Sequence, residues 1–240
     1  MKKHKELCYS TDGEEKVIQQ TIQKGLKMTI NYKLITINTM ETDNNASGKI
    51  MKILLKEFYL NHTVSSLAQR LVMSRVGIWK ILKRLEYSKL IMLASIGNGK
   101  TSAYIVKLNW ENILVEKKLA LLLSEDAIKQ ERWRFNFAEL EKHVSFLLLF
   151  GSILHSPKEA RDIDIFAVID NKKEFKTIDE IMLKIQGTQP KKIHFIDLTE
   201  SEFEQELNNR NKAYLDALAK GIILYGQENF IRLIKRLQTK

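Results

Sequence analysis

The chain has 240 residues, and 44% of them are hydrophobic, enough to fill one large domain or two small ones. No apolar run approaches the ~20 residues that a transmembrane helix needs. The charged N-terminus also lacks the long apolar stretch of a signal peptide, so we expect a cytoplasmic protein without a membrane segment. The single cysteine, Cys8, excludes an internal disulfide framework and cannot form a zinc site alone.

The positive charge is concentrated in one part of the chain. The whole sequence has a net charge of +10, and residues 46–108, with eleven Lys or Arg and two Glu, contribute +9 of it. A basic region beside a nearly neutral remainder indicates two domains, one of which meets a polyanion. Residues 1–45 show only weak helical and strand-like spacing, so we treat them as a poorly defined N-terminal segment without an assigned function.

Three helices are predicted at the start of the basic region. Ser47 is a suitable N-cap for a first helix ending near Leu60, Thr63 for a short second helix, and Ser74 for a third. The apolar residues of each recur at helical spacing, and the turn between the second and third is tight. This pattern predicts a helix-turn-helix.

A hairpin is predicted to complete this domain, which we place at residues 46–109. Strand-like runs at 91–96 and 103–108 are joined by a segment containing Asn98-Gly99, a strong hairpin signal. Helix-turn-helix plus hairpin resembles the winged helix of many prokaryotic transcription factors.

The third helix is predicted to bind double-stranded DNA, since its polar residues lie largely opposite its apolar side, as a helix in the major groove requires. Lys100 at the hairpin tip is placed to reach phosphate or the minor groove. A solvated basic helix and a winged helix used for protein contacts are the alternatives, and Trp79 suits packing as well as base contact. The candidate DNA-binding residues are Ser74, Arg75, Trp79, Lys80, Lys83, Arg84 and Lys100.

Residues 110–139 are predicted to be a helical linker. The segment has more apolar surface than a solvated connector needs, which would suit a homodimer seam. Trp133, Phe135 and Phe137 alternate near its end, a spacing that fits either an edge strand or core packing against the following domain.

Residues 140–240 are predicted to form a mixed sheet with helices packed against it. Its centre is FLLLFGSILHSPKEARDIDIFAVI, residues 146–169, which indicates strand, glycine turn, short helix and strand. Further apolar patterns predict a strand at 191–198 and helices at 175–185, 202–207, 213–219 and 229–237.

Asp162 and Asp164 are the candidate metal ligands. Residues two apart in a strand point to the same side, so the two carboxylates project together from the start of an apolar strand. Hard oxygen ligands of this kind suit Mg²⁺ or Mn²⁺ held together with substrate phosphates. Gly151 permits close backbone approach, and Ser152, opening a helix, offers N–H groups and a hydroxyl to phosphate.

Gly151-Ser152, followed after nine residues by Asp162-Ile163-Asp164, resembles the signature of the nucleotidyltransferase superfamily that includes DNA polymerase beta. The likeness is greatest to the small minimal nucleotidyltransferases and the aminoglycoside nucleotidyltransferases. It extends over about residues 140–225, with a tail at 220–226 that resembles the family's closing segment. The resemblance implies an α/β palm-like domain that holds Mg²⁺ on the aspartates and an NTP at the Gly-Ser turn.

The resemblance is incomplete at three positions. The family places a third carboxylate on the neighbouring strand, where this chain has His194, and Asp197 three residues later faces the other way in a regular strand. Ile153 replaces a basic residue common in relatives, and Arg161 a small one. Arg161 is therefore expected either to bind phosphate or to pair with an aspartate. His194 is a weak candidate for a base, and Asp197 a weak one for the third acid.

Two functions follow from these patterns. The first is Mg²⁺-dependent transfer of an NMP, expected to be AMP from ATP, to a hydroxyl acceptor, with the winged helix as a DNA-targeting or regulatory module. The second is a DNA-binding transcriptional regulator whose nucleotidyltransferase-like domain senses nucleotide or binds a partner without turnover. An aminoglycoside-modifying role is disfavoured, because such enzymes have no evident use for a DNA-binding module.

Overall fold

The computed structural model describes residues 45–96 and 103–239. Within this part, the residues from Ala46 onward belong to one compact unit that contains both predicted architectures. In the chain thus described, none of the helices combines the length and the apolar character that crossing a membrane requires.

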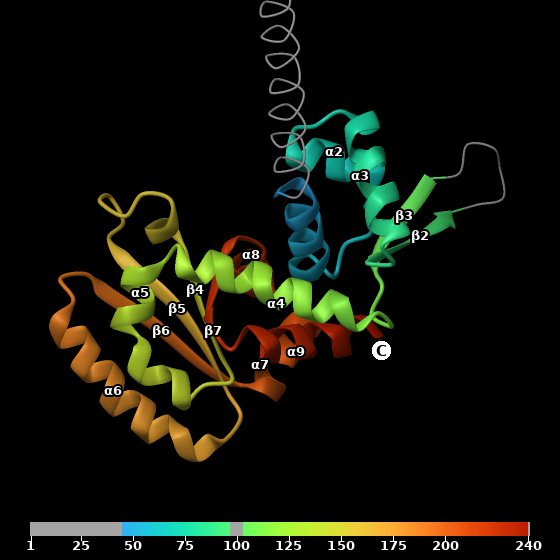
Figure 1. Ribbon diagram of the computed structural model, residues 1–240. Helices are drawn as coiled ribbons and strands as arrows, with labels where there is room; N and C mark the ends of the chain where they lie inside the picture. Colours follow the sequence, from blue (N-terminus) through green and yellow to red (C-terminus); the bar gives the residue numbers. More distant parts are fainter. Residues whose placement is uncertain (1–44, 97–102, 240) are drawn as a thin grey trace, which may run out of the picture. The chain divides into compact units, whose positions relative to one another are not determined.

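The N-terminal half of this unit has the helices and hairpin of a winged helix (Figure 1). Its sheet has the order β1-β3-β2, and β2 and β3 pair antiparallel along their whole length. The elements are a helix over residues 45–56, β1 His62–Thr63, α2 Val64–Leu71, α3 Arg75–Tyr87, β2 Ile91–Ile96 and β3 Ala103–Leu108.

Two of the three predicted caps are confirmed. Thr63 accepts a hydrogen bond from the Ser66 backbone N–H in a capping box, and Ser74 accepts one from the Gly77 N–H at 3.0 Å. The prediction that Ser47 caps the first helix is wrong, because residue 45 is already helical and Ser47 lies inside the helix. That helix also stops at residue 56, and a turn continues to Leu60.

The predicted linker is helical and consists of α4 Ile113–Ile128, α5 Glu131–Asn136 and the 3₁₀ helix η1 Ala138–Lys142. The edge-strand alternative for the three aromatic residues is wrong. Trp133 and Phe137, four residues apart, point to one side of a helical segment and are buried, whereas Phe135 is 83% exposed. Helical spacing therefore divides the three rings between core and solvent.

The C-terminal half is a mixed sheet in the order β6-β5-β4-β7, in which β5 and β6 are parallel and the other pairs antiparallel. Its strands are β4 Phe146–Phe150, β5 Asp162–Ile169, β6 Lys192–Thr199 and β7 Ile222–Tyr225. The helices that pack against it are α6 Phe175–Thr188, α7 Glu200–Asn208, α8 Lys212–Lys220 and α9 Gln227–Thr239.

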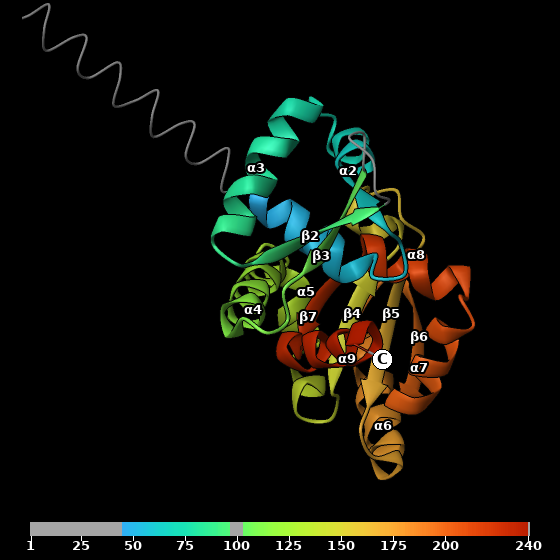
Figure 2. The same cartoon turned by 90° about the vertical axis from the view of Figure 1, so that its right-hand side faces the viewer.

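Side chains along β4 and β5 point alternately to the two faces of the sheet, so each face has its own hydrophobic core. One face packs with buried residues of α7, α8 and α9, which lie beside the strands in Figure 2, and its residues on β4 and β5 are Phe146, Leu148, Phe166 and Val168. Their neighbours in sequence point the other way and pack with α6, Trp133 and Phe137. Both faces of β4 and β5 are therefore buried, which explains their continuous apolar runs.

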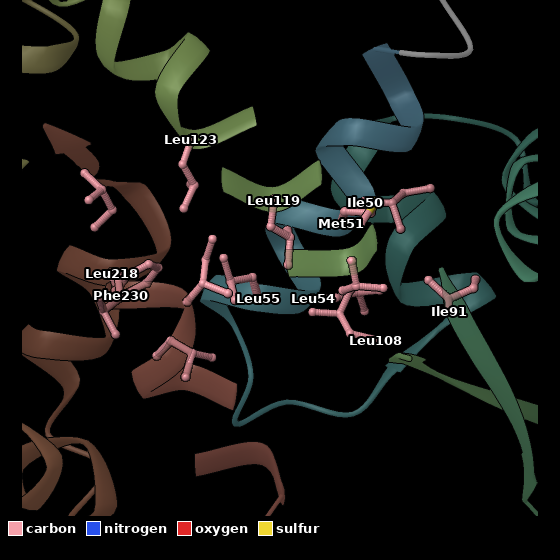
Figure 3. Packing of buried hydrophobic residues seen from close by; sticks show 14 of the residues in the cluster. Ile50, Met51, Leu54, Leu55, Ile91, Leu108, Leu119, Leu123, Leu218 and Phe230 are labelled. Carbon is pink, nitrogen blue, oxygen red and sulfur yellow. The ribbon is translucent and has the colours of Figure 1, made fainter. Parts of the chain in front are cut away.

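The winged helix and the sheet share one hydrophobic core. Leu119 and Leu123 of α4 lie between the helix over residues 45–56 and the helices α8 and α9 (Figure 3). The buried Lys56 ammonium donates a hydrogen bond to the Gly221 carbonyl at 2.6 Å, immediately before β7. The predicted domain limits of 46–109, 110–139 and 140–240 remain a prediction, and the contacts across them are extensive.

Candidate functional site

Asp162 and Asp164 lie at the start of β5, where β4 ends and the parallel strand β6 begins. In the register of the sheet, Asp164 is opposite Phe150 of β4 and His194 of β6. The Nδ1 atom of His194 is 3.4 Å from an Asp162 oxygen and 3.3 Å from an Asp164 oxygen. One ligand atom from each of the three side chains falls within 4.8 Å of the others, so the three form a candidate metal-binding group.

Gly151 forms the wall of this group on the β4 side. Its φ is +83°, in the region that favours glycine, and a Cβ at this position would lie 2.2 Å from an Asp164 carboxylate oxygen. The turn therefore excludes any side chain here for two reasons, its backbone conformation and the space that Asp164 occupies. This contact explains why Gly151 accompanies the aspartate pair.

The two carboxylates are partly withdrawn from water. Burial, and then the charge of Asp162, raise the pKa of Asp164, while His194 acts in the opposite direction. The side chains of Asp162 and Asp164 are 32% and 25% exposed, so a ligand can reach both. Such a pair is stabilised by a cation placed between its oxygens.

Arg161 does not fill that cation position. It is exposed, and within residues 45–96 and 103–239 the basic side chain that contacts Asp162 and Asp164, at 3.4 and 3.3 Å, is that of His194. Of the two roles expected for Arg161, pairing with an aspartate is thus absent from this structure, and phosphate binding stays a prediction.

Asp197 lies away from the cluster. It is opposite Ala167 in the parallel register, three residues beyond His194 in a regular strand. Ile193 and Phe195, which point to the same side of β6 as Asp197, pack into the core on the α6 face of the sheet. Burial raises the pKa of Asp197, and the charge of Asp179 on α6 adds a smaller effect in the same direction. The structure therefore brings His194, and not Asp197, to the two aspartates.

The segment after Gly151 is shorter than a regular helix. Ser152–Leu154 forms a single 3₁₀ turn, η2, and Ser152 is exposed beside Gly151. The Lys191 ammonium, just before β6, donates to the Ala160 carbonyl at the other end of the same loop. This bond, which the sequence pattern did not indicate, ties the loop to β6 directly before the acid pair.

A stack of aromatic rings adjoins the acids on the same face of the sheet. Phe166, two residues after Asp164, stacks with Phe150 at a centroid distance of 4.5 Å and with Tyr214 of α8 at 4.8 Å. Phe150 and Tyr214 remain partly exposed. The cluster therefore has an apolar, planar neighbour within the same domain.

The predicted DNA-binding residues lie on the outer side of α3. Arg75, Lys80, Lys83 and Arg84 are exposed, while Ile78, Ile81, Leu82 and Leu85 are buried. Ser74 is exposed, but its hydroxyl oxygen is engaged in the N-cap. Lys100 is outside the described residues.

Trp79 has a packing role. Its ring lies 5.5 Å from the ring of Tyr104 on β3, and the Lys83 ammonium stands 4.9 Å above it while pairing with Glu86 at 2.8 Å. Trp79 thus connects α3 to the hairpin. Tyr104 was not identified from the sequence as the partner of Trp79. The alternation of side chains along β3 is the signal that could have indicated it.

Several cations counted in the basic region are engaged within the protein. Lys52 pairs with Asp126 of α4, Arg70 pairs with Glu57 at 2.6 Å, and Lys56 is buried against Gly221. The charge available to a polyanion is therefore smaller than the +9 of the sequence and is centred on α3.

Comparison with known proteins assigns the second half of the chain. Residues 135–228 match the family model described as Polymerase beta, Nucleotidyltransferase, and the match contains Gly151, both aspartates and His194. None of the curated proteins searched matches the chain significantly.

Two solved structures of bacterial proteins are similar to the chain at low TM-score. The heme sensor protein PefR from Streptococcus agalactiae, in complex with heme, has 11% identity and a TM-score of 0.30, covering 75% of this chain and 94% of its own. A mutant of Lactococcus lactis ZitR in the apo form has 19% identity and a TM-score of 0.28, covering 68% and 96%. The winged-helix assignment rests on the helices and hairpin described above.

The family match begins at residue 135, within α5, and includes all four strands of the mixed sheet together with the acid cluster. Residues 135–228 are thus a nucleotidyltransferase domain of the polymerase beta type.

Proposed function

We propose that the protein transfers a nucleoside monophosphate, AMP from ATP, to a hydroxyl acceptor, and that its winged helix binds double-stranded DNA. The observation that carries the catalytic part is the group formed by Asp162, Asp164 and His194 inside a nucleotidyltransferase domain. The two carboxylates offer the hard oxygen ligands that suit Mg²⁺ or Mn²⁺, and the His194 imidazole lies within 4.8 Å of them as a further donor.

Asp162 and Asp164 would hold the metal, and the Nδ1 atom of His194 would complete the protein ligands. A bound divalent ion would neutralise charge on the α-phosphate and on the departing pyrophosphate. In the transfer itself, the acceptor oxygen forms a bond to the α-phosphorus and releases its proton to water, while the bond from that phosphorus to the oxygen that bridges it to the β-phosphate breaks and pyrophosphate leaves.

The nucleotide would lie between the Gly-Ser turn and the acids. Gly151 brings backbone close to Asp164, and the exposed Ser152 and Arg161 can contact phosphate oxygens from either end of the same loop. The partly exposed rings of Phe150 and Tyr214 offer a planar surface to a base. These residues bind and orient the substrate, which is the larger part of catalysis in phosphoryl transfer.

The test is label transfer from each α-labelled NTP, with Mg²⁺ or Mn²⁺, into protein, RNA and small molecules of a lysate. We expect Asp162→Asn/Asp164→Asn to lower transfer by about 1,000-fold or more, because the metal's charge stabilisation contributes several kcal/mol. Asp197→Asn is the matched control, since it removes an acid from the other face of the same sheet. Equal losses in both variants would contradict the assignment.

One observation favours the second function, a DNA-binding regulator without turnover. The Nδ1 atom of His194 stands within 3.4 Å of an oxygen of each acid, so its ring lies where a metal ion between the two carboxylates would bind. In that case no NTP is consumed under any condition, and salt-sensitive DNA binding persists in the double variant. The same labelling experiment separates the two functions.

A further inference from the structure

The outer face of α4 carries an apolar stripe. Leu114, Leu121 and Ile128 are 60%, 60% and 61% exposed, and they recur at heptad spacing on one side of the helix. The other side of the helix carries Val115, Leu119, Leu123 and Ala127, which are fully buried, and the first three belong to the hydrophobic core. The stripe is therefore the outward side of a helix already anchored along its whole length, and large apolar side chains there indicate a partner.

Charge is arranged symmetrically about the middle of this stripe. Lys117 precedes Leu121 by one turn and Glu125 follows it by one turn, so the two lie on opposite flanks of the stripe and at equal distances from Leu121. Lys117 also reaches Glu228 at 3.4 Å, but both side chains are two-thirds exposed, so that contact leaves the ammonium accessible.

The outward surface of α4 is complementary to the same surface of a second copy whose helix runs antiparallel to it. A two-fold axis through Leu121, perpendicular to the helix, places Leu121 on Leu121 and Leu114 on Ile128. The same rotation places each Lys117 against the Glu125 of the other copy. An isologous contact requires this self-complementarity, in which residue i meets j and j meets i. A parallel arrangement would instead place Lys117 against Lys117.

We propose that α4 forms an antiparallel, two-fold homodimer through Leu114, Leu121 and Ile128, with Lys117 and Glu125 pairing across the axis. A second copy of the chain is the occupant that both features select, because it supplies apolar and charged groups in the required order. The proposal is independent of the proposed catalytic and DNA-binding functions.

The oligomeric state of the full chain provides the first test, by light scattering after size-exclusion chromatography at several protein concentrations. We expect the mass of two chains for the wild type and of one chain for Leu121→Glu. Leu183→Glu is the matched control, since Leu183 is 75% exposed on α6, away from the stripe, and this variant should remain a dimer. A wild-type monomer at every concentration, as would result if residues 1–44 covered the stripe, would overturn the proposal.

Charge exchange tests the direction of the pairing. Lys117→Glu and Glu125→Lys should each weaken dimerisation by about tenfold, because each change makes two symmetry-related contacts repulsive. The double variant Lys117→Glu/Glu125→Lys should restore wild-type dimerisation. Failure of the double variant to recover would rule out the antiparallel register.

Cross-linking tests the position of the axis. In a Cys8→Ser background, which removes the single native cysteine, Leu121→Cys should be joined to its copy by a short bismaleimide. Leu114→Cys alone should not cross-link, because its expected partner is Ile128, whereas Leu114→Cys mixed with Ile128→Cys should. Cross-linking of Leu114→Cys to itself would demonstrate a parallel pair and overturn the proposal.

Discussion

The acid cluster of the sheet and the cations of the winged helix are both concentrations of like charge, but the fold holds them in different ways. Asp162 and Asp164 are fixed by strand register and by the Gly151 turn, and the basic side chain that contacts them among the described residues is that of His194. In the winged helix, Lys52, Lys56 and Arg70 bind partners inside the protein, and the α3 cations face outward. Net charge thus describes a region's composition, whereas the fold decides which charges a ligand meets.

The largest effect is expected from filling the space at Gly151. Gly151→Ala places a methyl group at 2.2 Å from an Asp164 oxygen and keeps a backbone conformation, φ +83° and ψ −166°, that is nearly confined to glycine and costs other residues roughly 1–3 kcal/mol. Because Asp164 must move, we expect label transfer to fall by about 100-fold or more. Salt-sensitive DNA binding should be unchanged.

Gly187→Ala is the control for Gly151→Ala. A Cβ at Gly187, in α6, meets nothing within 4 Å, so this substitution should leave transfer intact and raise the free energy of unfolding slightly, by about 0.5–1 kcal/mol. Full transfer in Gly151→Ala would show that the turn does not position Asp164.

An intermediate effect is expected from the internal cation Lys56. Burial lowers its pKa from 10.5 to about 8, with Asp126 acting in the opposite direction and Lys52 in the same one. Between these values the unfolded chain binds the proton and the folded chain releases it, so the free energy of unfolding increases with pH. From pH 8 to about 9.5 the gain should be roughly 2 kcal/mol.

Urea unfolding at several pH values measures this gain, and Lys56→Met, which has no titrating group, should abolish it. The window ends below pH 10, because burial raises the pKa of Tyr59, Tyr214 and Tyr225, and the stability they contribute is lost above the usual tyrosine value. An unaltered pH dependence in Lys56→Met would place its origin elsewhere.

The smallest effects are expected on the outer surface of the winged helix. Lys80→Ala, which removes an exposed cation of α3, should reduce the slope of log affinity against log salt by about 1 and weaken DNA binding several-fold. Arg70→Ala should leave the slope unchanged, since Arg70 is paired with Glu57 at 2.6 Å. Fluorescence anisotropy with a DNA duplex measures both. Equal slopes for Lys80→Ala and the wild type would contradict a DNA-binding role of this face.

Much of the architecture was predictable because it rests on local pattern. The hairpin strands were placed at their observed limits, and the Thr63 and Ser74 caps were read from residues that satisfy free N–H groups. The prediction for Ser47 was wrong because a serine can cap a helix but can also lie inside one, and here the helix already includes residue 45. The aromatic run at 133–137 misled because alternation over so few residues fits a strand as well as one helical turn.

The sequence by itself determined the acid pair, the glycine turn and the polymerase beta likeness, because strand periodicity places Asp162 and Asp164 on one side and a Gly-Ser motif is visible in order along the chain. Only the tertiary structure decided which third group joins them. His194 reaches the acids, and Asp197 does not, through the pairing of two parallel strands whose register involves residues some thirty positions apart. It likewise decided which lysines meet solvent and which face of α4 remains uncovered, since burial depends on what packs against a helix and not on the helix's own sequence.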